Sequence, residues 1–289
     1  MTTHDVLAGR TSEKTAVSPE IGKTIEVAGI ATNYHDVGSG DPVLLIHGSG
    51  PGVSAWANWR LSIPALAQHH RVIAPDILGF GYTERPADAT YDTQTWLDHL
   101  VGFLDALGLE RVSLVGNSFG GSLALKLATR HPDRVDRLVL MGSVGVLFPI
   151  TPGLDAVWGY EPSVAAMRHL LDVFAHDPRY ATDELAELRY RASVRPGVHE
   201  SYAAMFPEPR QDKVVEMSVP ERQIAALEHE TLIIHGRDDQ VIPMSNSLRL
   251  LDLIGNSRLH VFARCGHWVQ IEQTDQFNGL VDGFLSGLL

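Results

Sequence analysis

The chain has 289 residues, of which 44% are hydrophobic and 20% are charged. This is the balance of an ordinary globular protein, and the length suits one α/β enzyme that carries an insertion. The formal net charge of −12 disfavours nonspecific binding to nucleic acid or to an anionic membrane. An anionic substrate would gain nothing from long-range steering, so it would need a local cation in its pocket.

The single cysteine, Cys265, excludes an intramolecular disulfide and fits a reducing cytoplasm. No apolar run approaches the roughly 18 residues that a membrane-spanning helix requires. Residues 1–18 are polar and lack the apolar core of a signal peptide, so we interpret them as a flexible tail. A partner-binding arm is the alternative for this segment. Together these features predict a cytoplasmic protein.

Six short runs of β-branched and aliphatic residues have the continuous apolar character of strands that are buried on both faces of a parallel sheet. They are 43–46, 71–74, 112–115, 137–140, 231–234 and 258–262. Helix-compatible stretches lie between them, at 53–68, 93–107, 119–130 and 244–253. This alternation predicts an α/β fold with an open sheet, flanking helices and right-handed crossovers.

The stretch 146–209 breaks the alternation, because prolines interrupt it repeatedly and its periodic pieces are helical. We expect it to form a helical cap that is inserted after a sheet strand. Such a cap would lie over the carboxyl edge of the sheet, where ligands bind in α/β folds. Residues 19–145 and 210–289 would then form the core. A separate helical unit without substrate contact is the alternative.

The pentapeptide GNSFG at 116–120 follows an apolar run and opens a helix-compatible segment. It matches G-x-S-x-G, in which a serine occupies a sharp turn between a strand and a helix. Small residues are needed at both ends because the turn brings the helix backbone close to the strand. We therefore interpret Ser118 as a nucleophile; a plain glycine-rich turn is the alternative.

A nucleophilic serine needs a base, and the base needs an orienting carboxylate, in the chain order serine, acid, histidine. Asp238 and Asp239 both follow the run 231–234, where a strand-end acid belongs. We choose Asp239, because it occupies the position that the G-x-x-D turn of such folds gives to the acid. His267 follows the last predicted strand, and this position singles it out as the base among 14 histidines.

Acyl-type chemistry also requires N–H donors for a developing oxyanion. The amide after the nucleophile, that of Phe119, is the first candidate. The second is expected in the loop HGSGPG at 47–52, whose glycines allow N–H groups to turn inward. We assign the amide of Ser49 to this role, with the amide of Gly48 as a close alternative.

Several segments together resemble the meta-cleavage-product hydrolases, α/β-hydrolases that cut a carbon–carbon bond in ring-fission products of catechols. The resemblance rests on HGSGPGVSAWAN at 47–58, DILGFG at 76–81, Asn117 beside the nucleophile and CGHW at 265–268. It runs from about residue 19 to the C-terminus and includes the predicted cap. It implies a mostly parallel eight-stranded sheet, a homodimer, and no metal or organic cofactor.

The resemblance also implies a substrate, a 2-hydroxy-6-oxo-hexa-2,4-dienoate that is first converted to its keto tautomer and then cut between C5 and C6. His267 would move protons in both stages. Arg189 falls where the family binds the substrate carboxylate, and on a helix only one of Arg189 and Arg191 should face the pocket. Other residues match family positions around the same end of the substrate: Asn58, Asn117 and Trp268.

Simpler interpretations stay open for some of these residues. Arg189 would be an ordinary surface arginine if its helix faced outward, and Asn117 would only support the turn at the nucleophile. A carboxylesterase or lactonase would use the same triad, because a triad alone does not separate ester cleavage from carbon–carbon cleavage. Haloalkane dehalogenases and epoxide hydrolases are disfavoured, because they carry an aspartate where this chain has Ser118.

Overall fold

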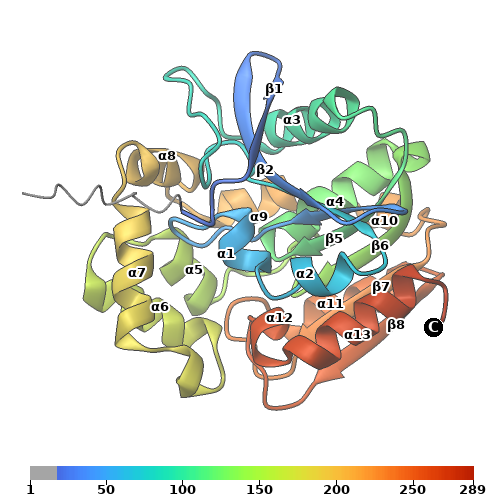
Figure 1. Ribbon diagram of the computed structural model, residues 1–289. Helices are drawn as coiled ribbons and strands as arrows, with labels where there is room; N and C mark the ends of the chain where they lie inside the picture. Colours follow the sequence, from blue (N-terminus) through green and yellow to red (C-terminus); the bar gives the residue numbers. More distant parts are fainter. Residues whose placement is uncertain (1–17) are drawn as a thin grey trace, which may run out of the picture.

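The computed structural model describes residues 18–289, so the predicted tail lies outside the described residues except for Ser18. One sheet with eight strands runs through the molecule in the order β1-β2-β4-β3-β5-β6-β7-β8 (Figure 1). The strands are β1 (Lys23–Val27), β2 (Ile30–Val37), β3 (Pro42–Ile46), β4 (Arg71–Pro75), β5 (Val112–Asn117), β6 (Val135–Met141), β7 (Thr231–Gly236) and β8 (Ser257–Phe262). The pairs β1–β2 and β2–β4 are antiparallel, and the remaining pairs are parallel. The predicted α/β fold with a mostly parallel eight-stranded sheet is confirmed.

The six parallel strands coincide with the six apolar runs, whereas the hairpin β1–β2 has no counterpart among them. Strand β1 lies at the edge of the sheet and is exposed at most of its positions. Strand β2 is also partly exposed and carries polar residues such as His35 and Asp36. Edge strands with one solvated face mix polar and apolar residues, so a search for continuous apolar runs does not detect them.

Helices cover both faces of the sheet. They include α1 (Ala55–Trp59), α2 (Ile63–Leu66), α3 (Thr93–Ala106), α4 (Phe119–Arg130), α10 (Glu221–Ile224), α11 (Met244–Leu253), α12 (Val269–Glu272) and α13 (Thr274–Leu285). The helix expected over 53–68 is divided into α1 and α2. Pro64 lies in the first turn of α2 and has no N–H to donate, so the chain begins a new helix there instead of continuing α1.

The core has two parts because consecutive strand residues point to opposite faces of the sheet. In β3, Leu44 and Ile46 pack into the larger cluster with α3 and α4. Val43 and Leu45 pack into the smaller cluster with α13. All four side chains are buried, which explains why this strand is apolar at every position.

Between β6 and β7 the chain forms a group of helices, and we call residues 146–209 the cap segment. Four helices lie in it, α5 (Pro152–Trp158), α6 (Val164–Phe174), α7 (Asp183–Ser193) and α8 (Val198–Met205), and α9 (Gln211–Met217) follows. The hydroxyls of Thr151, Ser163 and Thr182 accept hydrogen bonds from the first turns of α5, α6 and α7. Figure 1 shows α5 to α8 gathered beside one end of the sheet.

The order of the strands in the sheet indicates where a ligand-binding site should lie. The chain passes from β3 outward to β4 and then returns to β5 on the other side of β3, so the direction of winding reverses between β3 and β5. In open α/β sheets a crevice forms at the carboxyl ends of the strands at such a reversal, and ligands bind there. The loop after β3 and the turn after β5 are therefore the expected floor of a site.

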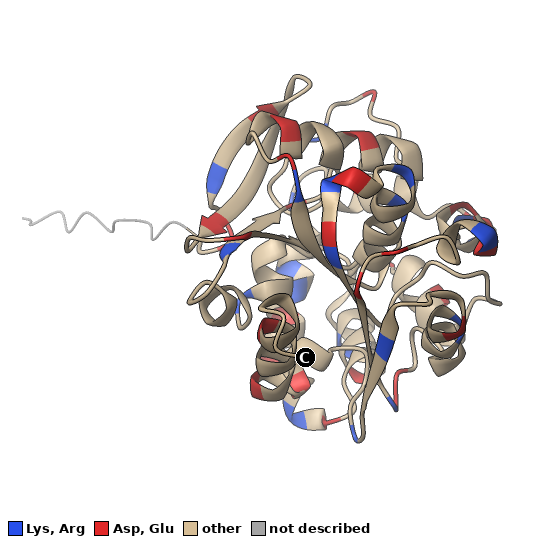
Figure 2. Ribbon diagram, turned by 90° about the vertical axis from the view of Figure 1, so that its right-hand side faces the viewer, with Lys and Arg blue, Asp and Glu red and all other residues tan. Residues whose placement is uncertain are grey.

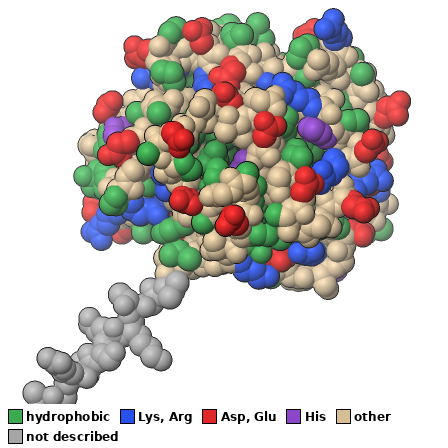
Figure 3. All heavy atoms as spheres, turned by 90° about the horizontal axis from the view of Figure 1, so that it is seen from above, with side chains coloured by type: hydrophobic (Ala, Val, Ile, Leu, Met, Phe, Trp, Pro, Cys, Tyr) green, Lys and Arg blue, Asp and Glu red, His purple; other side chains and the backbone are tan. Residues whose placement is uncertain are grey.

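Charged residues are spread over helices, strand ends and loops (Figure 2). On the face seen from above, acidic, basic and hydrophobic side chains are intermingled (Figure 3). The net charge of −12 therefore belongs to the surface in general, with no block of one sign standing out among the described residues in these views. Among residues 18–289, no helix has the length and apolar character needed to cross a membrane.

Candidate active site

Ser118 occupies the sharp turn between β5 and α4. Its φ angle is 55°, in the left-handed region that a serine rarely adopts, and its N–H donates to the Met141 carbonyl at 2.9 Å. A Cβ atom on Gly116 would lie 2.6 Å from the Gly120 carbonyl oxygen, and one on Gly120 would overlap the Ile46 carbonyl. The two glycines of the pentapeptide are therefore required by the close approach of helix and strand.

Asp239, the predicted acid, lies on the turn that follows β7. Asp239 Oδ2 accepts a hydrogen bond from His267 Nδ1 at 2.8 Å, whereas Oδ1 accepts the amides of Val241 and Ile242 at 2.7 and 3.0 Å. Burial acts to raise the pKa of Asp239, but the nearby His267 and the hydrogen bonds outweigh burial, and the pKa lies below its ordinary value. Asp238 instead lies 3.5 Å from His176.

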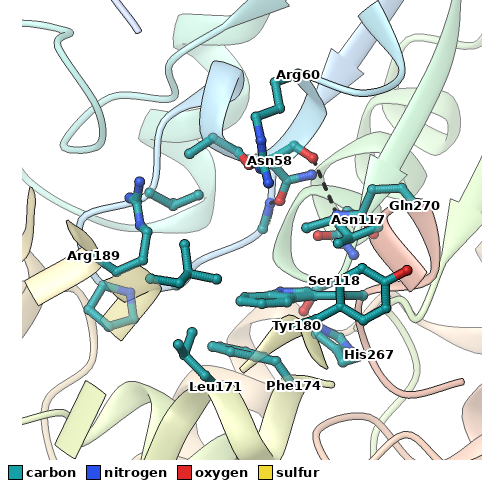
Figure 4. Close-up of a pocket in the computed structure, with 18 of the residues that line it drawn as sticks. Asn58, Arg60, Asn117, Ser118, Leu171, Phe174, Tyr180, Arg189, His267 and Gln270 are labelled. Carbon is teal, nitrogen blue, oxygen red and sulfur yellow. Dashed lines mark hydrogen bonds between the residues drawn. The ribbon is translucent and has the colours of Figure 1, made fainter. Parts of the chain in front are cut away.

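His267 is held on a loop after β8. Its main-chain N–H donates to the Phe174 carbonyl of the cap segment at 2.7 Å, and its ring stacks on the Phe174 ring with centroids 6.0 Å apart. Because Nδ1 is bonded to Asp239, Nε2 is the ring nitrogen left to exchange a proton with Ser118. Ser118 and His267 line the same pocket (Figure 4).

Glu272, on α12, connects the histidine loop to the cap segment. Its Oε1 accepts the Gly266 amide at 2.7 Å, and its Oε2 accepts the amides of His176 and Asp177, each at 2.9 Å. The Glu272 carboxylate thus forms hydrogen bonds both with Gly266, the residue before His267, and with the segment that follows α6. Our interpretation of the sequence gave Glu272 no role, because its partners are backbone amides that no motif identifies.

Two amides are available beside the nucleophile. The N–H of Phe119 is in the first turn of α4 and has no intrahelical acceptor. The N–H of Ser49 has no acceptor among the described residues, whereas that of Gly48 donates to Asn58 Oδ1 at 3.3 Å. This difference favours Ser49 over Gly48 as an oxyanion donor.

Ser49 is also fixed from the cap segment. The Trp158 indole N–H donates to Ser49 Oγ at 2.9 Å. The Tyr202 hydroxyl lies 2.9 Å from the Ser49 carbonyl and 2.7 Å from the Val157 carbonyl, with one hydrogen to donate. Side chains from α5 and α8 therefore hold the loop after β3 in place.

The pocket has a volume of about 510 Å³ and two chemically different sides. Leu171 and Phe174 lie on one side, and Asn58 and Arg60 lie on the other (Figure 4). Further apolar side chains come from α5, α6 and the loop after β7: Leu154, Val157, Met167 and Val241. Such a pocket suits an elongated ligand that is apolar at one end and charged at the other.

Arg189, on α7, lines this pocket, and Arg191 does not. The Arg189 side chain is 12% exposed and forms an ion pair with Glu20 at 3.3 Å. Its second terminal nitrogen donates to the Gly52 carbonyl. Arg191 is exposed and pairs with Glu187 one turn earlier on the same helix. The predicted carboxylate ligand therefore faces the pocket, but part of its hydrogen-bonding capacity is already used.

The other predicted substrate contacts also line the pocket. Asn58 Nδ2 is buried without a hydrogen-bond partner among the described residues, so it is available to a ligand oxygen. Asn117 is the last residue of β5 and is buried, with Nδ2 3.5 Å from the Met141 carbonyl. The Trp268 ring stacks on Phe174 with centroids 4.9 Å apart and planes 13° apart.

Several polar residues that line the pocket were not predicted from the sequence, among them Glu20, Arg60 and Gln270. Glu20 precedes β1, and Arg60 follows α1. Gln270, on α12, donates from Nε2 to the Asn58 carbonyl at 3.4 Å (Figure 4). Arg60 stands two positions after Asn58, at the end of the segment that carries the resemblance, and this proximity was the one available signal. Nothing local in the sequence marks Glu20 or Gln270.

Comparisons with known proteins identify the family of the chain. Residues 41–274 match the family model of the alpha/beta hydrolase fold. The chain is 64% identical to 2-hydroxymuconate semialdehyde hydrolase from Pseudomonas sp. strain CF600, over 93% of this chain and 95% of that protein. It is 60% identical to 2-hydroxy-6-oxo-2,4-heptadienoate hydrolase from Pseudomonas putida strain F1, over 94% of this chain and 99% of that protein.

Among solved structures, the meta-cleavage product hydrolase CumD from Pseudomonas fluorescens IP01, complexed with acetates, is 58% identical. The two structures superimpose with a TM-score of 0.92, and the match covers 93% of this chain and 99% of the CumD chain. These matches cover nearly the full length of both proteins in each comparison. The chain belongs to the α/β-hydrolase family and, within it, to the meta-cleavage product hydrolases.

Proposed function

We propose that the protein hydrolyses the C5–C6 bond of a 2-hydroxy-6-oxo-hexa-2,4-dienoate to 2-hydroxypenta-2,4-dienoate and a carboxylic acid. The observation that carries the proposal is the pocket itself. Ser118 and His267 line it together with an apolar wall and with two partly buried arginines, Arg60 and Arg189. This combination fits an anionic molecule whose reactive carbonyl is separated from its carboxylate by an extended chain.

The triad supplies the proton transfers that this reaction needs. His267 first moves a proton from the 2-hydroxyl group to C5, which converts the dienol to its keto tautomer. Ser118 then attacks C6, or His267 activates a water molecule that attacks C6. The C5–C6 bond breaks, and its electron pair stays on the five-carbon fragment, which becomes a dienolate. Water provides the hydroxyl of the acid product and the proton of the diene product. Ionised Asp239 stabilises the imidazolium that forms transiently.

The backbone and the pocket walls have roles in the same steps. The N–H groups of Ser49 and Phe119 stabilise the oxyanion that develops at C6. Asn58, Asn117 and Trp268 bind the polar end of the substrate, and Arg189 binds its carboxylate. The cap segment, residues 146–209, acts as a lid over a core formed by residues 19–145 and 210–289. No metal or organic cofactor is needed, because the triad provides both nucleophile and base.

We further propose that the natural substrate is 2-hydroxymuconate semialdehyde or an analogue with a small alkyl group at C6. Relatives at 64% and 60% identity are named for the aldehyde and for the heptadienoate, which carries a methyl group at C6. Relatives named for 6-aryl dienoates are 36% and 33% identical. This order supports a hydrogen or a small alkyl substituent.

A carboxylesterase or lactonase remains the rival function, since it would use the same triad. The partly buried arginines argue against it, because a neutral ester has no charge to match theirs.

The test is loss of the absorbance of the coloured dienoate at neutral pH. Wild-type enzyme should bleach it rapidly, and Ser118→Ala should nearly abolish the bleaching. Turnover by Ser118→Ala at the rate of the wild-type enzyme would refute the assignment of Ser118 as the nucleophile. Comparing kcat/KM for dienoates with hydrogen, methyl, isopropyl and phenyl at C6 then ranks the substrates. A preference for neutral esters over all four would favour the rival function.

We also propose that the protein works in the cytoplasm as a homodimer. The single cysteine and the catabolic activities for which the relatives are named support the location. Light scattering coupled to size-exclusion chromatography tests the assembly, because the chain mass is 31.6 kDa and a dimer would have about twice that mass.

A further inference from the structure

Three charged side chains line the polar side of the pocket: Glu20, Arg60 and Arg189. We call them the charge cluster. They come from the segment before β1, the end of α1 and the middle of α7, so they are far apart in the sequence. Glu20 and Arg189 are nearly buried, with 15% and 12% of their side chains exposed. A further lining arginine, Arg179, is 81% exposed and paired with Asp177.

Glu20 is held in a fixed position within the charge cluster. Its Oε1 pairs with Arg189 at 3.3 Å, and its Oε2 accepts a hydrogen bond from Ser54 Oγ at 2.7 Å. Ser54 in turn caps α1 through the Ala57 amide at 3.1 Å. Both carboxylate oxygens are therefore engaged by residues that the fold places, and the carboxylate is a fixed part of the pocket wall.

Arg60 and Arg189 differ in how many N–H groups remain free to bind a ligand. Arg189 donates both to Glu20 and to the Gly52 carbonyl. Arg60 makes one hydrogen bond among the described residues, to the Ala57 carbonyl at 2.9 Å. Its side chain runs toward Asn58 (Figure 4), whose Nδ2 has no partner. Arg60 therefore offers a ligand more free N–H groups than Arg189 does.

The charges of the cluster can be counted. Two guanidinium groups and one carboxylate leave one net positive charge, because arginine stays protonated at neutral pH. One net charge matches one substrate carboxylate. The diene product keeps that carboxylate, so a site with two unopposed arginines would also bind the product more tightly and slow its release.

We propose that Arg60 is a further ligand of the substrate carboxylate beside Arg189, and that Glu20 limits the affinity of this site for anions by opposing Arg189. This inference rests on the proposed function, because it assumes an anionic dienoate as the substrate. Arg60 and Glu20 are thus specificity-determining residues with opposite effects. Arg189 keeps its own contact with the carboxylate and is oriented by Glu20.

The test measures binding of hexa-2,4-dienoate, which has the carboxylate and the diene but no bond to cleave, by titration calorimetry. Relative to wild type, Arg60→Ala should weaken binding about tenfold, and Glu20→Gln should strengthen it about tenfold. Arg191→Ala, which removes an exposed arginine of α7, should leave binding unchanged. The neutral hexa-2,4-dienamide should bind all four proteins equally.

Turnover gives a second, independent measurement. With the dienoate substrate, Glu20→Gln should lower KM and lower the inhibition constant of 2-hydroxypenta-2,4-dienoate by similar factors. Arg60→Lys should recover part of the binding that Arg60→Ala loses, which separates loss of charge from misfolding. Unchanged binding of hexa-2,4-dienoate by Arg60→Ala, or weaker binding by Glu20→Gln, would overturn the proposal. Absence of dienoate turnover in wild type would refute the proposed function, whereas the calorimetric result would still decide the charge assignment.

Discussion

The pocket joins two regions that are built in different ways, the triad and the charge cluster. The triad lies on turns that immediately follow strands β5, β7 and β8, so its residues are placed by local chain geometry at one edge of the sheet. The charge cluster is assembled from Glu20, Arg60 and Arg189, and its central contact joins residues 169 positions apart. We therefore expect catalysis to depend on the sheet, and recognition of the anion to depend on how distant segments pack together.

The first prediction distinguishes Asp239 from the adjacent Asp238 as the acid of the triad. Asp239→Asn should reduce kcat by about 10⁴-fold, because the amide would favour the wrong tautomer of His267 and could not stabilise its charged form. Asp238→Asn should change kcat little, since Asp238 faces His176 instead. Steady-state kinetics on the dienoate measures both variants. Equal losses would contradict the assignment of Asp239 as the acid.

The second prediction concerns the anion-binding region. Arg189→Ala should reduce kcat/KM for the anionic dienoate by about ten- to a hundredfold, because it removes a charge-assisted contact. Hydrolysis of a small neutral ester should be spared, because the triad is not touched. The comparison uses the same enzyme preparation with both substrates. If both activities fell equally, Arg189 would have a structural role and not a carboxylate-binding one.

The third prediction tests the connection between the triad and the cap segment. Glu272→Gln should lower kcat about tenfold for dienoate and ester alike, because it weakens the bond to Gly266 that positions the loop of His267. KM should change less than kcat. Glu221→Gln, which alters an exposed glutamate paired with Arg249, is the matched control. A change confined to KM would show that Glu272 does not act through the histidine.

The fourth and smallest effect is expected at the oxyanion loop. Trp158→Phe removes the indole N–H that donates to Ser49 Oγ while keeping an aromatic ring in the cap segment. The loss of one neutral hydrogen bond corresponds to about 1 kcal/mol, or roughly a fivefold decrease in kcat. Dienoate kinetics together with thermal unfolding would separate this effect from a loss of stability. A decrease in stability without a change in kcat would contradict the positioning role.

The same contrast explains what could be predicted from the sequence. Ser118 was identified because its pentapeptide lies between a strand and a helix, and His267 because it follows the last strand. The central parallel strands β3, β5 and β7 are buried at nearly every position, which makes their sequences largely apolar, whereas β8 is mostly exposed. These signals are local, so they can be read from a few consecutive residues.

Other features depend on contacts that no local pattern records. The hairpin β1–β2 was missed because its edge strand is mostly exposed. The division of the predicted helix at 53–68 follows from Pro64, which has no N–H to continue α1. Glu20 and Glu272 act through an arginine on α7 and through backbone amides, respectively. Both glutamates are unremarkable in their own surroundings, and only the folded chain gives them partners.

The bridge made by Glu272 restricts how the enzyme can take in its substrate. The main-chain N–H of His267 donates a hydrogen bond to the Phe174 carbonyl. The Glu272 carboxylate accepts hydrogen bonds from the amide of the preceding residue, Gly266, and from the amides of His176 and Asp177. Opening the cap segment at this corner would therefore displace His267, the proposed base. A path that leaves His267 in place would begin at another part of the pocket, such as the part that Ser18 and Pro19 line next to Glu20. Entry by that path would bring the carboxylate past Glu20 and Arg60 before the carbonyl reaches Ser118.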